Sequence, residues 1–464
     1  MVFPIVGGDG KPTGYEISNS IRFNSASSSY LSFTTSTPTS QRIATWSFWM
    51  KKANDATQVI FGSSGDYMEI YNESDGELWF YMSDSNSDFL KSTALHRDQS
   101  AWYHIVMVLD TTQGTEANRA KTFVNGTQLT DFISENYPSQ NDDLTGLAAS
   151  KNFHIGARAY GGAASYLDAY IADFNFVDGS ALDPTYFGET NDNGVWIPKK
   201  PDVSSYGNNG FFLEFKQTGT SANSSGMGAD TSGNDNHFAS NNLASDHVTT
   251  DTPQNNFATF NPLDNDTITG AASFSEGNLV INANGDPQSG CPSTIAVSNG
   301  AWYIEGKCLS GTFEIGVFGY GDGFSFNLAN HPPYGDNGYP FLYEYGGNIR
   351  INNVNSQTSV ATFTTNDILA IALDMDNNTI KFFKNGSQVG STITDSNLST
   401  FAPYSFYVAN HTSGNTGNIF SLNTGNPVYT ISSGNADANG YGNFEYAPPS
   451  GYYALCTKNL AEYG

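Results

Sequence analysis

The chain has 464 residues, with 45 acidic and 19 basic side chains and a formal net charge of −26. Such a charge repels nucleic acid phosphates and anionic lipid surfaces and excludes both as partners, while neutral sugars, proteins and cations remain. Aromatic residues make up 14% of the chain and charged residues also 14%, a balance that argues against disorder and against a helical protein. The composition predicts an all-β protein whose turns and outer faces carry Asn, Ser, Thr and Gly.

The N-terminal segment has no basic stretch followed by an apolar one, and no run approaches the roughly 18 apolar residues of a membrane span. We therefore expect cytosolic synthesis and no membrane insertion. Three cysteines, Cys291, Cys308 and Cys456, are too few and too scattered for a disulfide framework, although a Cys291–Cys308 pair stays open as the minor alternative.

Short strands are predicted first between residues 20 and 187, where apolar and polar residues alternate and Asn-Gly and Asp-Gly pairs mark hairpin turns. The segment 102–110 is almost continuously apolar, which predicts a central strand covered on both faces. The predicted strands are Ser20–Phe23, Tyr30–Phe33, Ala44–Lys51, Gln58–Gly62, Tyr67–Tyr71, Glu77–Met82, Trp102–Asp110, Lys121–Val124, Asn152–Ala157 and Ala169–Phe176.

A polar segment, 189–266, follows this first block and is too long for an ordinary loop. Because it contains the strand-like run 210–215, we expect an ordered, mostly irregular linker. A second strand-rich block follows, so the predicted organisation is an arm (1–19), a first domain (20–188), the linker (189–266), a second domain (267–432) and a C-terminal segment (433–464). The strands predicted in the second block are Ala301–Lys307, Thr312–Phe318, Phe341–Glu344, Asn348–Asn352, Asp367–Asp374, Thr379–Asn385 and Tyr404–Ala409.

Four ordered motifs of the first block resemble the laminin-G-like, concanavalin A-like lectin/glucanase jelly roll: ATWSFWMKK from Ala44, AWYHIVMVLD from Ala101, KTFVNG from Lys121 and the stretch from Phe153 to Leu182. In the second block, AWYIEGK, FEIGVFGYG, the stretch from Asp367 to Gly390 and APYSFYVAN resemble a SPRY domain, another concanavalin A-like sandwich. The resemblance thus implies two concanavalin A-like jelly-roll β-sandwiches in tandem.

The linker and the C-terminus carry a further resemblance. GADTSGNDNHF from Gly228, DTPQNNFATFNPL from Asp251 and YAPPSGYYALCTKNL from Tyr446 resemble segments of fibre and appendage proteins of tailed, particularly marine, bacteriophages. The resemblance implies a virion protein, oligomeric and trimeric by family analogy, whose partners are other virion proteins and host glycans.

Enzymatic chemistry is the first site hypothesis to test, because glucanases of this fold need two carboxylates about 5–5.5 Å apart for retention. Glu69 and Glu73 share a strand face but lie about 13 Å apart at the rise of a strand, and Glu214 stands alone. No nucleophile motif or nucleotide-binding loop is present in the sequence, and His104 in its apolar strand is expected to be packed and hydrogen-bonded. We therefore expect no catalytic residues and no enzyme.

Two oxygen-rich turns are candidate calcium sites, since Ca²⁺ takes carboxylate, amide and backbone oxygens. The alternative for both is an Asx turn whose side chains bond the local backbone. No cofactor is otherwise required. The candidate ligands are Asp84, Asn86, Asp88, Asp230 and Asn234.

Aromatic and amide side chains in exposed loops are candidate carbohydrate contacts, and the loops at one end of SPRY-like sandwiches form a binding surface. The alternative is that these tyrosines pack against a neighbouring subunit or the sandwich rim. The candidates are Tyr160, Tyr166, Tyr320, Asn330, Tyr334 and Tyr339. In the arm, the apolar residues Phe3, Ile5 and Val6 precede a Gly-rich hinge and are expected to dock onto another virion protein, a disordered terminus being the alternative.

The sequence thus predicts a virion structural protein of a tailed bacteriophage, a tail fibre or surface appendage whose lectin-like sandwiches attach to host glycans. A capsid decoration or head-fibre protein that binds only virion proteins is the main alternative, and a glycan depolymerase is the third.

Overall fold

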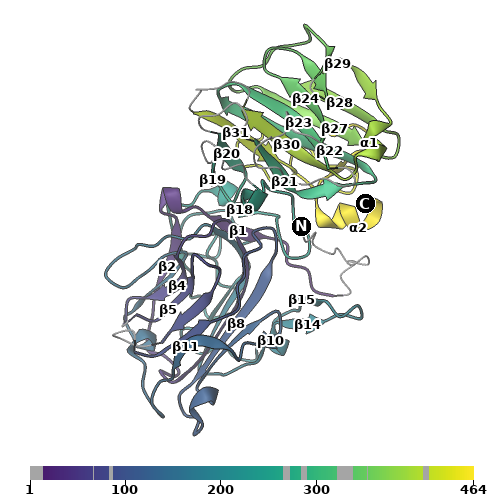
Figure 1. Ribbon diagram of the computed structural model, residues 1–464. Coiled ribbons are helices and arrows are strands. Elements are labelled where there is room, and N and C mark those ends of the chain that lie inside the picture. The colour runs from purple at the N-terminus through teal and green to yellow at the C-terminus, as the bar shows by residue number, and fades with distance from the viewer. Residues whose placement is uncertain are drawn as a thin grey trace. The chain divides into compact units, whose positions relative to one another are not determined.

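The computed structural model describes residues 14–65, 67–82, 87–264, 272–283, 290–320, 338–352, 354–410 and 417–464. It divides into an N-terminal unit, residues 11–254, and a C-terminal unit, residues 255–464, each taken by itself below (Figure 1). Both units are built from sheets whose strands are almost all antiparallel, which confirms the predicted all-β class. Among the described residues, no helix is long and apolar enough to cross a bilayer.

The N-terminal unit is a sandwich of two sheets, here called the back sheet and the front sheet. The back sheet has the order β10 (Thr127–Gln128), β9 (Ala120–Val124), β8 (Tyr103–Asp110), β3 (Ile43–Lys52), β13 (Ala169–Asp178), β1 (Ser20–Phe23) and β18 (Val248–Thr249), with β16 (Phe211–Leu213) also paired to β13. The front sheet has the order β11 (Phe132–Asn136), β7 (Phe89–Ser92), β6 (Leu78–Tyr81), β5 (Glu69–Asn72), β4 (Gln58–Ser63), β12 (Asn152–Ile155), β2 (Tyr30–Thr34) and β17 (Ala239–Asn241).

Aromatic side chains from both sheets meet in the core between them. Trp46 of the back sheet is fully buried, with its ring centroid 5.7 Å from that of Phe61 and 5.4 Å from that of Phe80, both of the front sheet. Because Phe and Trp each bury about 150–250 Å², a few such contacts dominate the packing energy.

The outer face of the back sheet is also covered, as the apolar segment 102–110 predicted. Val106 of β8 packs with Val177, Phe187 and Tyr206 in a second small core. The hairpin of β14 (Gly188–Thr190) and β15 (Trp196–Pro198) lies close by, since Trp196 Nε1 donates a hydrogen bond to His104 Nδ1 at 3.0 Å. His104 Nε2 lies 2.9 Å from Ser47 Oγ, and burial lowers the His104 pKa to about 3, so this histidine is a neutral packing residue.

The predicted linker contributes β14 to β18, and its residues up to 254 belong to the N-terminal unit. Three of its apolar side chains, Phe211, Leu213 and Phe238, are fully buried in the main core of that unit. These anchors explain how an Asn-rich and Ser-rich segment is held in an ordered path.

The segment 14–19 runs along the outer face of the back sheet. Ile17 packs against Trp49 and Ala172, and Gln254 holds the segment by accepting from Ile17 N at 2.8 Å and donating to Tyr15 O at 2.7 Å. Tyr15 also donates a hydrogen bond to Asp173 Oδ2 at 2.7 Å. Asp173 has φ +46° at a register shift in β13, so a bulge directs its carboxylate to the tyrosine.

Asp173→Asn is expected to stabilise the N-terminal unit by about 1–2 kcal/mol at pH 8 and to have little effect near pH 4. Burial raises the Asp173 pKa to about 7, helped by Glu214 and opposed by the Tyr15 hydrogen bond and Lys216. The folded state then binds more protons than the unfolded state between about pH 4 and 7, so wild-type stability falls as pH rises through this window. Urea unfolding of both proteins from pH 4 to 8 measures this, and a difference that stays constant with pH contradicts it.

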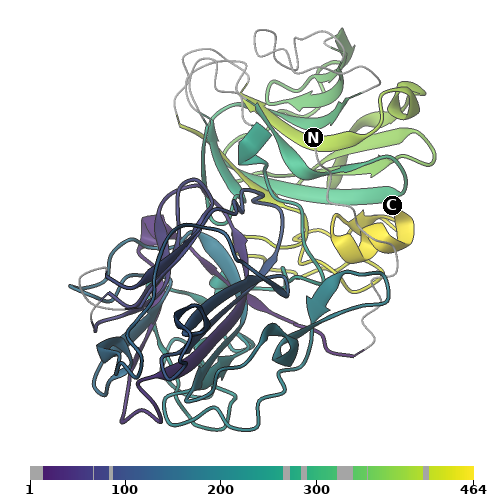
Figure 2. The same ribbon diagram turned by 60° about the horizontal axis from the view of Figure 1, so that its bottom comes forward.

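The C-terminal unit is a second sandwich, shown from two directions in Figures 1 and 2. One sheet has the order β19 (Ser273–Ser275), β20 (Val280–Ala283), β31 (Asn418–Asn423), β22 (Ala301–Ser310), β27 (Ile368–Asp374), β28 (Thr379–Lys384) and β29 (Ser387–Thr394). The other has the order β21 (Gly290–Val297), β30 (Tyr404–Asn410), β23 (Phe313–Gly319), β24 (Tyr339–Glu344), β25 (Ile349–Ile351) and β26 (Val354–Gln357).

Aromatic rings again join the two sheets of this unit. Phe420 of one sheet has its ring centroid 5.7 Å from that of Phe313 and 6.4 Å from that of Phe406, both of the other sheet. At the C-terminus, β32 (Tyr453–Ala454) pairs parallel to β22, and helix α2 (Thr457–Tyr463) follows. Two of the predicted Asn-Gly hairpins, at 125–126 and 385–386, have both residues at positive φ, as a type I′ turn requires. All three cysteines are buried and free.

Candidate functional site

An aromatic patch covers the outer surface of the front sheet and is called here the aromatic face. Along β5, β6 and β7 the side chains of Ile70, Leu78, Phe80 and Leu90 point into the core, so their neighbours in the strands point outward. The outward residues that define the aromatic face are Tyr71, Trp79, Tyr81, Phe89 and Lys91.

The centre of the aromatic face is a block of four side chains on the β6–β7 pair. Trp79 lies opposite Lys91 and Tyr81 lies opposite Phe89, and all four are partly exposed. Lys91 Nζ lies 4.1 Å from the ring centroid of Trp79, 4.8 Å from that of Phe89 and 5.4 Å from that of Tyr81. The aromatic rings therefore hold an ammonium group among them by cation–π attraction.

Beside this block, a carboxylate and a guanidinium are paired. Glu69 is fully buried, Tyr71 Oη donates a hydrogen bond to it, and Arg158 Nε lies 3.4 Å from its Oε1. Arg158 Nη2 also donates to Tyr71 Oη at 2.8 Å. Burial raises the Glu69 pKa, while the Tyr71 and Arg158 contacts oppose the shift. Glu69 is thus tied into a network that fixes Tyr71 and Arg158 on the face.

The loop 156–166 lies against one side of the aromatic face. It can do so because Gly62 of β4 has no side chain: a Cβ there would come 2.9 Å from Ala159 N. The loop presents Tyr160, which is 37% exposed and whose ring centroid lies 4.2 Å from that of Tyr67, with the two rings tilted by 35°. Tyr166 ends the loop with its ring 6.1 Å from that of Tyr30. The predicted Tyr160 and Tyr166 thus lie beside Tyr67 and Tyr30, in the loop that carries Arg158.

The remaining candidate carbohydrate contacts belong to the second sandwich. Tyr320 follows the end of β23 and is only 7% exposed, with its hydroxyl donating to Ser405 Oγ at 3.1 Å. Tyr339 begins β24 and stacks 4.8 Å from Phe401, and its hydroxyl accepts from Asn397 Nδ2 at 2.9 Å. Asn330 and Tyr334 lie outside the described residues.

Both oxygens of Asp230, a candidate calcium ligand, accept hydrogen bonds from the protein. Oδ1 accepts from Phe212 N at 2.9 Å and Ser232 N at 2.8 Å, and Oδ2 accepts from Ser232 Oγ and Asn236 N, each at 2.9 Å. Asn234 donates to two backbone carbonyls. The turn thus has the Asx-type bonding that stood as the alternative at sequence level.

The other oxygen-rich turn is described only in part. Asp84 and Asn86 lie outside the described residues, and Asp88 precedes β7 with its carbonyl accepting from Met82 N at 2.9 Å. Within the described ranges, no three His, Cys, Asp or Glu side chains are grouped to hold a metal ion. Calcium binding stays a prediction. The arm residues Phe3, Ile5 and Val6 also lie outside the described residues.

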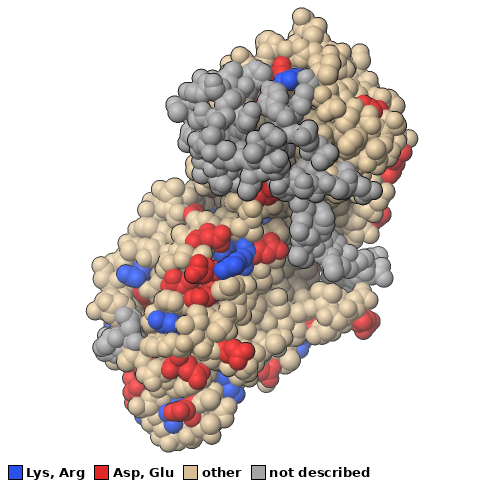
Figure 3. Space-filling model, viewed as in Figure 1, with Lys and Arg blue, Asp and Glu red and all other residues tan. Residues whose placement is uncertain are grey.

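Glu73 and Glu214, the other carboxylates considered for catalysis, each have a partner of their own. Glu73 accepts from Thr57 Oγ1 at 2.6 Å, just after the end of β5, and Glu214 pairs with Lys216 at 2.5 Å. Neither shares the Glu69 network. On the face of the molecule seen in Figure 3, most of the described surface is neither acidic nor basic, and the charged side chains stand singly or in small groups.

Sequence comparison finds two domain families in the chain. Residues 25–185 match the concanavalin A-like lectin/glucanases superfamily, and residues 322–419 match the SPRY domain. No curated protein matches the chain.

Several solved structures show similarity to part of this chain. The SPRY domain of human HERC1 is 19% identical, with a TM-score of 0.28 over 35% of this chain and 96% of that one. The heptameric SAP-like pentraxin of Limulus polyphemus is 20% identical, with a TM-score of 0.29 over 36% and 80%. A Bacteroides ovatus protein assigned to carbohydrate binding is 14% identical, with a TM-score of 0.33 over 51% and 60%. The family matches thus place a region similar to the concanavalin A-like lectin/glucanases superfamily before a region similar to the SPRY domain.

Proposed function

We propose that this chain is a non-enzymatic glycan-binding protein and that the aromatic face of its N-terminal unit holds the saccharide. The observation that carries the proposal is the block of Trp79, Tyr81 and Phe89, three partly exposed rings on adjacent strands. Sugars bury their apolar C–H faces against such rings while planar polar groups bond their hydroxyls. Arg158, whose side chain is 33% exposed, supplies such a planar polar group at the edge of the block.

The engagement of the carboxylates supports binding without hydrolysis. Glycoside hydrolysis needs a carboxylic acid and a second carboxylate placed across one glycosidic bond. Glu69 is held by Tyr71 and Arg158, while Glu73 and Glu214 have partners of their own. A glycan array followed by a reducing-end assay separates the functions: binding without release supports a lectin, whereas release of reducing ends supports a depolymerase.

Trp79→Ala is expected to weaken glycan binding about tenfold or more, because a central aromatic anchor commonly contributes over 1 kcal/mol to an interface. Tyr160→Ala tests how far the binding surface extends along the 156–166 loop. Tyr186→Ala is the matched control, since Tyr186 is 36% exposed against 37% for Tyr160 and lies outside the aromatic face. Isothermal titration with the best array ligand gives the affinities, and equal binding by Trp79→Ala and wild type contradicts the proposed site.

The biological setting that we propose is a tail fibre or surface appendage of a tailed bacteriophage, assembled as a homotrimer in the virion and attaching to host glycans. The support is the resemblance of the segments at 228–238, 251–263 and 446–460 to phage appendage proteins. The competing role is a capsid decoration or head-fibre protein that binds only virion proteins. Light scattering of the purified protein gives the stoichiometry, and an electron density map of intact particles gives the location. Absence of the chain from purified particles would refute the virion role.

A further inference from the structure

Lys91 stands out on the aromatic face because its charge is held by rings. Its Nζ lies within 5.4 Å of three ring centroids, those of Trp79, Tyr81 and Phe89. Three other cations of this unit pair with carboxylates: Arg42 with Asp143 at 2.7 Å, Lys52 with Asp55 at 2.6 Å and Arg158 with Glu69 at 3.4 Å. Among the described residues, no carboxylate lies within ion-pair distance of Lys91.

Two carboxylates in this part of the front sheet already have hydrogen-bond partners. Glu77 accepts from Trp79 Nε1 at 2.9 Å, and Glu69 accepts from Tyr71 and pairs with Arg158. Cation–π contacts compensate an ammonium only in part, about 0.5–2 kcal/mol, and they leave its N–H donors available to an anion. Lys91 therefore offers a localised positive charge within a stacking surface for a sugar ring.

We propose that the aromatic face selects an anionic saccharide, whose sugar ring stacks on Trp79 or Phe89 while its acidic group binds Lys91. This inference rests on the proposed glycan-binding function and specifies its ligand class. Because an ammonium is a point charge without the planar fork of a guanidinium, it accepts a carboxylate or a sulfate ester alike. The shared chemistry is thus an acidic group on a pyranose ring.

The net charge of −26 does not forbid such a ligand. At physiological salt the Debye length is about 8 Å, so charges beyond that distance are largely screened. The charge at the binding surface itself therefore determines whether an acidic ligand is attracted. The ammonium is a few ångströms from the rings on which the sugar would stack. The same screening predicts that binding of an acidic glycan weakens as salt rises, whereas binding of a neutral glycan changes little.

The test uses the full-length protein with three probes of equal length: a hexuronate tetrasaccharide, its carboxyl-reduced neutral form and a sulfated tetrasaccharide. Wild type is expected to bind an acidic form about tenfold more tightly than the neutral one. Lys91→Gln is expected to remove that preference and leave neutral binding in place, and Lys91→Arg is expected to restore it. Lys121→Gln is the matched control, because Lys121 is also partly exposed and lies on the back sheet.

The outcomes separate the two proposals. Equal binding of acidic and neutral probes by wild type, or an unchanged preference in Lys91→Gln, overturns the anionic selectivity and leaves glycan binding intact. Failure of all three probes, together with a blank glycan array, overturns glycan binding and the selectivity with it. Lys91→Gln and Lys121→Gln are expected to have the same thermal unfolding temperature. A preference lost only in Lys91→Gln is then due to the missing charge and not to unfolding. If the carboxylate probe alone or the sulfate probe alone shows the preference, that probe identifies the acidic group.

Discussion

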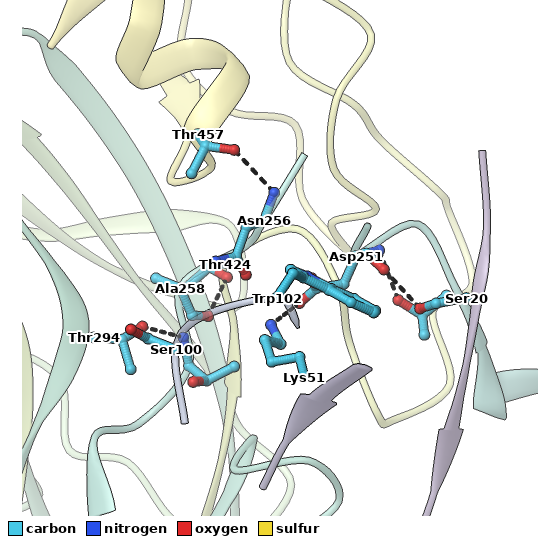
Figure 4. A network of polar contacts seen from close by, with 12 residues as sticks. Ser20, Lys51, Ser100, Trp102, Asp251, Asn256, Ala258, Thr294, Thr424 and Thr457 are labelled. Atoms are coloured by element: carbon cyan, nitrogen blue, oxygen red, sulfur yellow. Dashed lines mark hydrogen bonds and ion pairs between the residues drawn. The ribbon is translucent and has the colours of Figure 1, made fainter. Parts of the chain in front are cut away.

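Replacing Asp251 by alanine is expected to lower the free energy of unfolding of the N-terminal unit by about 3–5 kcal/mol, since it leaves a buried ammonium without its counter-charge. The side chains of Lys51 and Asp251 are 1% and 0% exposed, and Nζ lies 2.5 Å from Oδ2 (Figure 4). Trp102 Nε1 donates to the other carboxylate oxygen at 3.2 Å, and Ser20 Oγ donates to the Asp251 carbonyl at 2.6 Å. Asp251 thus ties the segment that ends the unit to β3 and to the residue before β8 through its carboxylate, and to β1 through its backbone carbonyl.

The free energy of unfolding of the Asp251→Ala variant is expected to depend on pH in a characteristic way. Burial lowers the Lys51 pKa, and Asp251 opposes the shift. Without Asp251 the folded-state pKa falls further below the value of about 10.4 in the unfolded chain, so the unfolded state binds more protons. The stability of the variant should therefore rise with pH up to about 10.

A double variant separates the contribution of the ion pair to stability from that of the packing around it. Lys51→Met combined with Asp251→Asn should recover most of the stability lost in Asp251→Ala, because no buried charge is then unpaired. Denaturant unfolding at pH 6, 8 and 10 measures the free energy of unfolding of each variant. A loss below about 1 kcal/mol, or a loss that does not shrink with pH, would show that water or another group compensates Lys51.

The fold was largely predictable because its sandwiches are assembled from local patterns. The Asn-Gly turns at 125–126 and 385–386 fixed two hairpins, and the unbroken apolar run at 102–110 predicted a strand covered on both faces. The path of residues 189–254 was harder to foresee. Its strands β16, β17 and β18 are two or three residues long and pair with partners more than thirty residues away, such as β17 with β2, so no local sequence period predicts them.

The aromatic face is a proposed site whose residues were predicted from sequence only in part. Tyr160 and Tyr166 could be named because they lie in a Gly-rich loop, and their role in binding stays a prediction. The strand of residues 78–81, LWFY, is apolar throughout, so alternation cannot say whether Leu78 and Phe80 or Trp79 and Tyr81 face the core. The pairing of β6 with β7 settles the choice by placing Trp79 opposite Lys91. Tyr320 was predicted to lie in an exposed loop but is buried, because its ring packs against that of Phe318, with the centroids 5.4 Å apart.

Glu305→Ala is expected to destabilise the C-terminal unit by about 3 kcal/mol, because this carboxylate organises the C-terminal segment. Glu305 is 1% exposed, and its Oε1 accepts from Tyr446 N at 2.8 Å and Tyr303 Oη at 2.9 Å, while Oε2 accepts from Glu445 N at 2.9 Å. Removing the acceptor leaves these donors without their partner, at about 1–3 kcal/mol for each one that stays buried.

The local consequence distinguishes this loss from general destabilisation. The amides of Glu445 and Tyr446 should lose hydrogen-exchange protection in Glu305→Ala before strands β22 and β27 do, since those strands keep their own ladder. Glu305→Gln should fall between alanine and wild type, because its amide retains one acceptor oxygen but turns an NH₂ group toward the other donor. Glu462→Ala, an exposed change in α2 of the same unit, should stay within about 0.5 kcal/mol of wild type. Unchanged protection at residues 445 and 446 would mean that the segment is held by its pairing with β22 rather than by Glu305.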